Sequence, residues 1–251
     1  IRISKFEFQD VDDWPDFSAR KHAPWAAEGL KSVGEKVGDS VARLGFAGAP
    51  WTVCMYLMAG GTGDKDFQNT RAKIFSNHEK SKKMLNKMGE IVGDLLADQV
   101  LFGGADAVQL FDTWAGLLSP EMYHKFAMPA TKKAIDTFRK KAGDDIPVIH
   151  YAKGSGHLHP SIRKLDLNAI SLDWRDDLAE NRARYGKELA FQGNLDPSLL
   201  HGSVDAAQQA TRDVLRAAGE EPGHIFNLGH GFAPAARIEC VEAVLKVISG
   251  E

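Results

Sequence analysis

The fold is decided by one stretch, Ile225-Phe226-Asn227-Leu228-Gly229-His230-Gly231. Its apolar start is typical of a buried strand, and its glycines permit positive φ angles and remove side-chain bulk where a loop opens. The imidazole of His230 offers a hydrogen-bond donor or acceptor near neutral pH. We therefore expect a strand that ends in a ligand-binding loop; a tight turn with an incidental histidine is the alternative interpretation.

Five further stretches repeat this pattern of an apolar run followed by small and polar residues. Because the runs are almost continuously apolar, they predict parallel strands that are covered on both faces. The six expected strands are 44–48, 107–111, 147–151, 169–173, 189–192 and 225–228. Between them apolar residues recur at helical spacing, most clearly from Met84 to Leu95. Further helices are expected at 26–42, 119–141, 203–218 and 236–249, an edge strand at 2–8 and a loop at 10–23.

The alternation of strands and helices predicts an α/β protein with a parallel sheet and right-handed crossovers. Two architectures fit this pattern, an open doubly wound sheet and a (β/α)8 TIM barrel. An open sheet that binds a dinucleotide would carry a G-x-G-x-x-G turn, but after Gly229 and Gly231 the third glycine is replaced by Pro234. Six units are too few for a complete barrel, and residues 1–40 do not supply two more. We expect a single domain over 1–251, because no linker interrupts the chain.

Composition limits the classes of function. The 251 residues carry a formal net charge of −3, which gives no case for a nucleic-acid partner. Cys54 and Cys240 lack the spacing of a zinc knuckle, and so few cysteines indicate a reducing compartment. No stretch approaches the roughly 20 apolar residues of a membrane span. We expect no metal, since His157 and His159 lie in a glycine-bounded loop without a third ligand.

Residues capable of chemistry follow the expected strands, at the end of a parallel sheet where ligands bind. They are Tyr56, Asp112, Thr113, Lys153, Asp173, Trp174, Asn194, Asp196 and His230. Each has a structural alternative: Asp173 would cap a helix, Asp196 would form a turn with Asn194, and Lys153 would be a solvated loop residue. Taken together, these loops are richer in glycine and aromatic residues than simple connections usually are.

In chain order, these motifs resemble those of the uroporphyrinogen decarboxylase family. The segment 46–52 with Tyr56 is similar to the region after the third strand of that family, and 109–116 is similar to its fourth. The segments that resemble its fifth to eighth strands are 149–153, 172–174, 192–197 and 227–231. The resemblance implies a single (β/α)8 barrel, of which this chain covers units three to eight and lacks the first two.

The resemblance also implies an activity, the removal of carbon dioxide from the four acetate side chains of uroporphyrinogen to give coproporphyrinogen in heme and chlorophyll biosynthesis. The family uses no metal or organic cofactor. Loss of carbon dioxide leaves electrons that need a sink, and protonation of a pyrrole carbon makes the ring that sink. The site must supply this proton, hold the ring cation and bind several carboxylates. Membership would further imply a homodimer in the cytoplasm, or in a plastid.

Three substrate-binding positions carry over from the family. Tyr56 would hydrogen-bond a substrate carboxylate, Thr113 stands where the family commonly has serine, and His230 would contact a propionate or an acetate. The catalytic residues stay unknown, because the family's N-terminal arginine motif and the aspartate after its second strand have no counterpart here. We therefore expect this polypeptide alone to show little activity.

Three other functions are compatible with the motifs. A zinc-dependent methyltransferase of the same superfamily, acting on a corrinoid or a thiol, would need cysteine ligands past the barrel strands, and none is found there. A phosphosugar enzyme would use the seventh and eighth loops for phosphate. The third alternative is a truncated, inactive homologue that binds a tetrapyrrole or only a partner.

Overall fold

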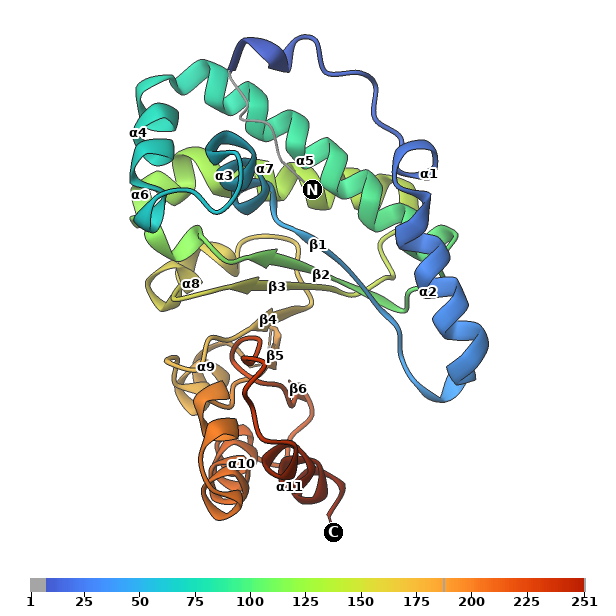
Figure 1. Ribbon diagram of the computed structural model, residues 1–251, viewed down its shortest axis with the longest axis vertical. Coiled ribbons are helices and arrows are strands. Elements are labelled where there is room, and N and C mark those ends of the chain that lie inside the picture. The colour runs from blue at the N-terminus through green and yellow to red at the C-terminus, as the bar shows by residue number, and fades with distance from the viewer. Residues whose placement is uncertain (1–7, 187, 251) are drawn as a thin grey trace. The chain divides into compact units, whose positions relative to one another are not determined.

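The computed structural model describes residues 8–186 and 188–250, which divide into two compact units (Figure 1). Unit 1 comprises 1–150 and 157–167, and unit 2 comprises 151–156 and 168–251. Strand β3, Val148–Ala152, contributes its first three residues to unit 1 and its last two to unit 2. The expected edge strand at 2–8 lies outside the described residues except for Phe8, which begins a 3-10 helix, Phe8–Val11.

Unit 1 is built on parallel strands β1, Leu44–Gly48, and β2, Ala107–Asp112, with Phe46 opposite Gln109. Its helices are α1 Ala19–His22, α2 Pro24–Val37, α3 Pro50–Ala59, α4 Gln68–Ser76, α5 His78–Leu101, α6 Pro120–Met122, α7 Met128–Ala142 and α8 His159–Ile162. The expectation of a loop at 10–23 was wrong for α1. That helix starts where the backbone N–H of Ala19 donates to Asp94 of α5 over 2.7 Å, an anchor that local sequence does not reveal.

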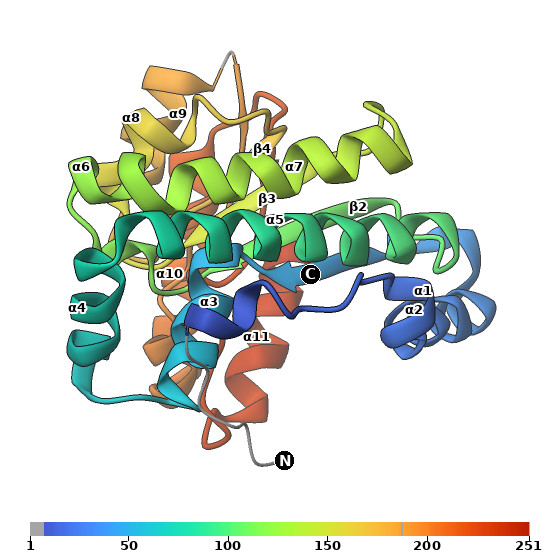
Figure 2. The ribbon, with the colours of Figure 1, turned by 90° about the horizontal axis from the view of Figure 1, so that it is seen from above.

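Helices α5 and α7 lie side by side over most of their length, as Figure 2 shows. Two glycines of α5 make this approach possible, since a Cβ at Gly89 would lie 2.7 Å from the carbonyl oxygen of Ala130. At Gly93 a Cβ would lie 2.4 Å from the carbonyl oxygen of Ala134. The buried methionines Met84 and Met88 fill the core on the same helix, as their spacing predicted.

The helix expected at 119–141 is interrupted near its start. Ser119 caps it as predicted, accepting from the backbone N–H of Met122, but Tyr123–Ala127 forms a π-helical turn before α7 begins. Pro129 explains the interruption, because it has no N–H to donate to the preceding turn. Gly143, at φ 91°, ends the helix where expected.

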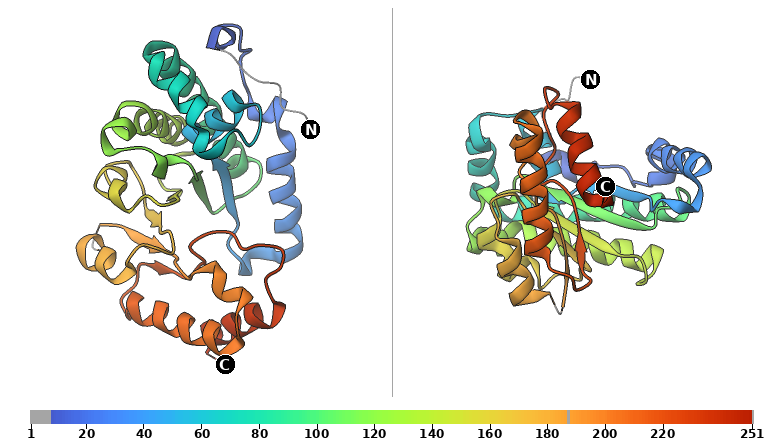
Figure 3. Two further views of the ribbon diagram at one scale, coloured as in Figure 1. Left: turned by 60° about the vertical axis from the view of Figure 1, so that its left-hand side comes forward. Right: turned by 90° about the horizontal axis from the view of Figure 1, so that it is seen from below.

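Unit 2 contains strands β4, Ala169–Ser171, β5, Ala190–Gln192, and β6, His224–Ile225, which pair in parallel in that order. Helices α9 Leu178–Tyr185, α10 Val204–Ala218 and α11 Ile238–Ser249 accompany them. Figure 3 shows α10 beside α11. Their shared core includes Ala207, Cys240 and Val244. The strand expected at 225–228 is shorter because the Asn227 side chain accepts from the N–H of Leu228, which leaves an isolated bridge between Leu195 and Leu228.

The six strands neighbour one another in chain order, β1 to β6. A doubly wound sheet reverses its strand order at a switch point, whereas a barrel adds each strand beside the last. The prediction of a parallel α/β fold is confirmed, and the order favours the barrel over the open sheet. Among the described residues, no helix is both long and apolar enough to cross a membrane.

The close packing of α5 on α7 predicts that Gly93→Ala destabilises the protein by about 1–3 kcal/mol, the usual cost of overpacking. The matched control is Gly29→Ala on α2, where a Cβ meets nothing within 4 Å and alanine is the better helix former. Urea unfolding of both variants gives the comparison. Equal midpoints would show that α5 and α7 do not approach as closely as described.

Candidate functional site

The polar end of β2 is held by the first turn of α3. Oγ1 of Thr52 donates to Oδ1 of Asp112 over 2.7 Å and accepts from the backbone N–H of Trp114 over 3.1 Å. The indole N–H of Trp51 donates to the carbonyl of Trp114 over 3.2 Å. Thr113 lies between these two anchored residues, so its backbone is fixed on both sides.

Tyr56 follows Thr52 by one helical turn on α3 and is half-buried. Its ring packs edge-on against Trp114, with 6.2 Å between centroids, and against Phe67 at 5.6 Å. Phe67 in turn packs on Trp114 at 4.8 Å. Within unit 1 the structure therefore brings Tyr56 against the neighbour of Thr113, which is itself half-buried.

Asp112 is a buried carboxyl group that forms no ion pair with any residue in the described ranges. It is 0% exposed, and its Oδ2 has no hydrogen-bond partner among the described residues. Burial raises the pKa of Asp112 to about 7, although the hydrogen bond from Thr52 opposes the shift. The same burial, together with the charge of Asp112, raises the pKa of the buried Tyr123.

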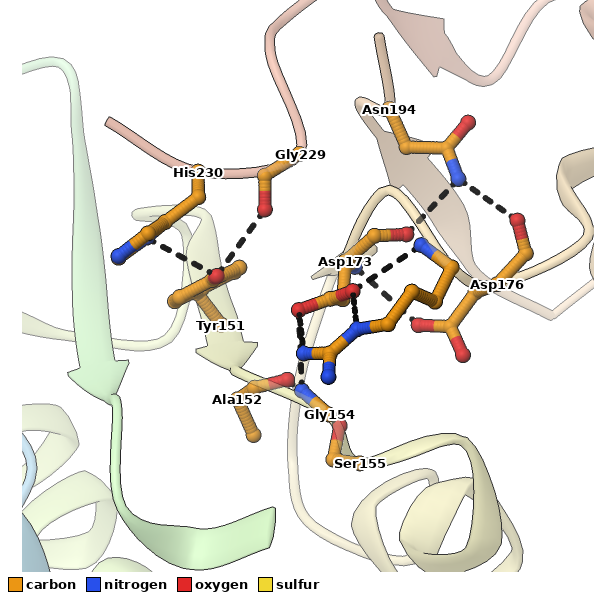
Figure 4. Close-up of polar contacts among 10 residues, drawn as sticks. Tyr151, Ala152, Gly154, Ser155, Asp173, Asp176, Asn194, Gly229 and His230 are labelled. Carbon is orange, nitrogen blue, oxygen red and sulfur yellow. Dashed lines mark hydrogen bonds and ion pairs between the residues drawn. The ribbon is translucent and has the colours of Figure 1, made fainter. Parts of the chain in front are cut away.

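Asp173, past β4 in unit 2, has the opposite surroundings. It accepts the backbone N–H of Gly154 over 3.0 Å and pairs with Arg175 through two contacts of 2.6 Å, from Nε and Nη2 (Figure 4). Burial alone would raise the pKa of Asp173, but these hydrogen bonds outweigh it and the pKa is lowered. Asn194, past β5, donates to the carbonyls of Asp173 and Asp176, which joins the loops after β4 and β5.

His230 packs between two aromatic side chains of unit 2. Its ring is nearly parallel to Tyr151, with 5.8 Å between centroids, and to Trp174, with 6.2 Å. The hydroxyl of Tyr151 lies 3.0 Å from the carbonyl oxygen of Gly229 and 3.2 Å from Nδ1 of His230. Figure 4 shows the other ring nitrogen of His230 directed away from Tyr151.

Burial and the neighbouring charges together lower the pKa of the His230 imidazole. Burial lowers the pKa of His230, and the cations Lys153 and Arg175 lower it further, while Asp173 acts in the opposite sense. Lys153 lies 5.8 Å from the centre of the Trp174 ring. Lys153, Asp173 and Trp174 were only candidates from the sequence, and Tyr151 was not among them.

The two glycines beside His230 have different roles. A Cβ on Gly229 would lie 2.2 Å from the backbone nitrogen of Trp174, whereas one on Gly231 would meet nothing within 4 Å. Gly229 therefore lets the loop after β6 contact the loop after β4. The pattern Gly-His-Gly alone does not distinguish these two positions.

Other candidates from the sequence have structural partners. Asp196 accepts from the backbone N–H of Ser198 and caps the 3-10 helix Pro197–His201, as the turn interpretation predicted for that residue, whereas the Asn194 side chain bonds to the loop after β4 instead. His157 contacts the carbonyl of Leu118 over 2.8 Å, and His159 is buried at the start of α8. Neither arrangement tests the expectation that no metal binds.

A parallel β/α fold with aromatic, hydroxyl and imidazole side chains past its strand ends defines the class, that of α/β proteins in which ligands generally bind at the carboxyl ends of the strands. Comparison with known proteins then identifies the family. The sequence profile described as "Uroporphyrinogen decarboxylase (URO-D)" matches residues 2–250. The chain belongs to the uroporphyrinogen decarboxylase family, which confirms the resemblance found in the motifs.

Curated relatives support this membership. The chain is 35% identical to a uroporphyrinogen decarboxylase of Magnetococcus marinus, a match that covers 99% of this chain and 68% of the relative. It is 33% identical to one of Pseudomonas fluorescens, over 95% of this chain and 67% of the relative. The chain thus spans about two thirds of the length of these relatives.

A solved structure supports the fold. A methyltransferase from Methanosarcina mazei superposes with a TM-score of 0.75 at 20% identity, over 90% of this chain and 64% of the other. This likeness concerns the fold alone, and it confirms the predicted fold class.

The contact at Gly229 predicts that Gly229→Ala lowers stability by about 1–3 kcal/mol through overpacking. Gly231→Ala, two positions away, should stay within about 0.5 kcal/mol of the parent. Thermal unfolding monitored by circular dichroism measures both. A Gly229→Ala variant as stable as Gly231→Ala would contradict the described contact with Trp174.

The raised pKa of Asp112 predicts a specific pH dependence of stability. Between the ordinary carboxyl pKa of 3.8 and about 7, the folded state holds a proton that the unfolded state has lost. Stability therefore falls as pH rises through this window, by up to about 1.4 kcal/mol per pH unit. Asp112→Asn should remove that part of the slope, and the exposed Asp39→Asn should not. The measurement is the midpoint of urea unfolding between pH 4.5 and 7.5. The same pH dependence of stability in Asp112→Asn and in the parent would contradict the assignment of this slope to Asp112.

Proposed function

We propose that this chain forms the substrate-binding part of a uroporphyrinogen decarboxylase, which removes carbon dioxide from the four acetate side chains of uroporphyrinogen to give coproporphyrinogen. The observation that carries the proposal is the family match over 2–250, together with the positions of Tyr56, Thr113 and His230 past the ends of their strands. The names of the curated relatives supply the substrate.

In this proposal Tyr56 and Thr113 donate their hydroxyl protons to substrate carboxylates, and His230 binds another carboxylate. The aromatic contacts of Tyr56 with Trp114 and Phe67 support its role, since they fix the ring and leave the hydroxyl as its polar end. The hydrogen bonds of Thr52 to Asp112 and Trp114 support the role of Thr113, because they fix the backbone on both sides of that residue.

The reaction requires a proton for a pyrrole carbon and a group that stabilises the resulting ring cation. The resemblance assigns these roles to an arginine motif and an aspartate of the first two barrel units. We propose that both belong to a part of the enzyme outside these 251 residues, an interpretation that the share of the relatives matched here supports. Addition of that segment at the N-terminus should then raise the rate of coproporphyrinogen formation.

The methyltransferase alternative is not favoured by the cysteines. Cys54 and Cys240 are both 0% exposed, and burial strongly raises the pKa of the Cys54 thiol. A zinc-bound substrate thiol requires ligands that lose their protons readily, and a buried thiol in apolar surroundings resists that loss. Cys240 moreover belongs to the core between α10 and α11.

Two further expectations follow from the family rather than from contacts in this chain. We propose that the protein acts as a homodimer and that it works in the cytoplasm. Sedimentation equilibrium of the purified protein tests the first, and fractionation of the source cells tests the second.

Removal of single substrate contacts should lower activity without unfolding the protein. Each of Tyr56→Phe and Thr113→Val deletes one hydroxyl donor to a charged group, worth about 1.5–3 kcal/mol, and should raise KM for uroporphyrinogen roughly 10- to 100-fold. Thr113→Ser keeps the hydroxyl and should retain the parent KM within a few-fold. The measurement is coproporphyrinogen formation by the N-terminally extended chain. Parent kinetics in both hydroxyl-deletion variants would refute these site residues, and an inactive extended parent would refute the function.

A further inference from the structure

The hydroxyl of Tyr151 determines which nitrogen of His230 carries a proton. The carbonyl oxygen of Gly229, 3.0 Å away, can only accept a hydrogen bond, so it takes the single hydroxyl proton of Tyr151. The phenolic oxygen is then left with acceptor positions only. Nδ1 of His230, 3.2 Å from that oxygen, must therefore donate to it.

A neutral imidazole has only one N–H, so a proton on Nδ1 leaves Nε2 as a bare acceptor. A carboxylate is also an acceptor and cannot hydrogen-bond to such a nitrogen. Packing restricts the position of the ring, since Tyr151 is 3% exposed and His230 is stacked against both Tyr151 and Trp174.

We propose that Tyr151 is a positioning residue that holds neutral His230 in its Nδ1–H tautomer, so that His230 binds a substrate carboxylate only by taking up a proton from solvent at Nε2. The inference rests on the proposed function for the identity of the ligand, a carboxylate of the macrocycle. The tautomer itself is a property of the free protein. Binding at His230 thereby becomes a step that consumes one proton.

The groups that face His230 agree with this proton uptake. The hydroxyl of Tyr151 is kept protonated, because burial and then Asp173 raise its pKa. Arg175 is paired with Asp173, whereas Lys153 makes no ion pair within the described part of the chain. Because burial and these cations lower the pKa of His230, the free protein holds the neutral ring near pH 7. An arriving carboxylate offsets the positive charge and favours protonation.

The tautomer is tested first, by nuclear magnetic resonance of the protein labelled with ¹³C and ¹⁵N at histidine. The signals of His230 are those that vanish in His230→Asn. The inference expects the shifts of an Nδ1–H imidazole in the free protein above the pKa of His230, and a mixture of tautomers in Tyr151→Phe. An Nε2–H ring in the parent would overturn it, whether or not the protein is a decarboxylase.

Proton uptake is tested by calorimetric titration with uroporphyrin, the oxidised macrocycle that keeps every carboxylate of the proposed substrate. Repeating the titration in buffers of different ionisation enthalpy counts the protons bound. The parent should take up close to one proton more than His230→Asn, and above the pKa of His230 its affinity should fall about tenfold per pH unit. Equal proton counts, or no binding of uroporphyrin, would overturn the inference.

The decisive variant is Tyr151→Phe, in which the neutral ring is free to carry its proton on Nε2 and donate without protonation. The extra proton uptake should drop by at least half and the pH dependence of affinity should flatten, changes that a merely structural role would not produce. Tyr185→Phe, the same substitution on α9, should behave as the parent. Parent-like proton uptake in Tyr151→Phe would overturn the role of Tyr151, while coproporphyrinogen formation by the extended chain separately reports on the proposed function.

Discussion

The carboxylate of Asp173 is the constraint on which the loops past the strand ends of unit 2 depend. It has no exposed surface, yet it stays ionised because Arg175 and the backbone of Gly154 satisfy its oxygens. Asn194 binds the carbonyl of the same residue, so one position joins the loops after β3, β4 and β5. Trp174 is the next residue. Its backbone contacts Gly229, and its ring packs against the ring of His230. The hydrogen bonds of Asp173 thus order the backbone next to Trp174, against which the His230 ring packs.

Asp112 occupies the corresponding place at the end of β2, with a different outcome. No cation pairs with it among the described residues, and its hydrogen bonds come from Thr52, through the hydroxyl and the backbone of that residue. Its carboxyl group therefore titrates near neutrality, whereas Asp173 remains charged. A buried carboxyl is costly to ionise unless its charge is paired and hydrogen-bonded, and the two residues show both sides of that rule. In each case the acidic group lies beside a proposed substrate contact: Asp112 directly precedes Thr113, and Asp173 directly precedes Trp174, on which His230 packs.

Much of this arrangement could be predicted from the sequence, for identifiable reasons. The strand β1 was predicted at its observed bounds from its apolar run, but the expectation that every strand is covered on both faces was wrong for β1, because Leu44 and Phe46 are exposed. Ser119 and Gly143 marked helix ends through their local chemistry. The π-turn at Tyr123–Ala127 and the short β6 depend on single backbone groups, which periodicity does not register.

The site was only partly predictable. His230, Tyr56 and Thr113 stood out because their motifs resemble a known family, but their partners did not. Tyr151 is 79 positions away from His230 in the chain, and Thr52 is 60 positions away from Asp112. Such pairs are joined by tertiary packing, for which one sequence carries no local signal. For the same reason the sequence could not predict that glycine is required at position 229 but not at 231. The clash that excludes a Cβ at Gly229 involves Trp174, which is distant in the chain.

The burial of both native cysteines has a practical consequence. Cys54 and Cys240 have no exposed surface, and the Cys54 thiol resists deprotonation, so neither should react readily with a maleimide. A cysteine introduced at a solvent-exposed position would then be the one readily labelled group on an otherwise unaltered chain. Fluorophores or spin labels can thus be attached to each unit in turn. Movement on ligand binding can then be followed without first replacing the two native cysteines.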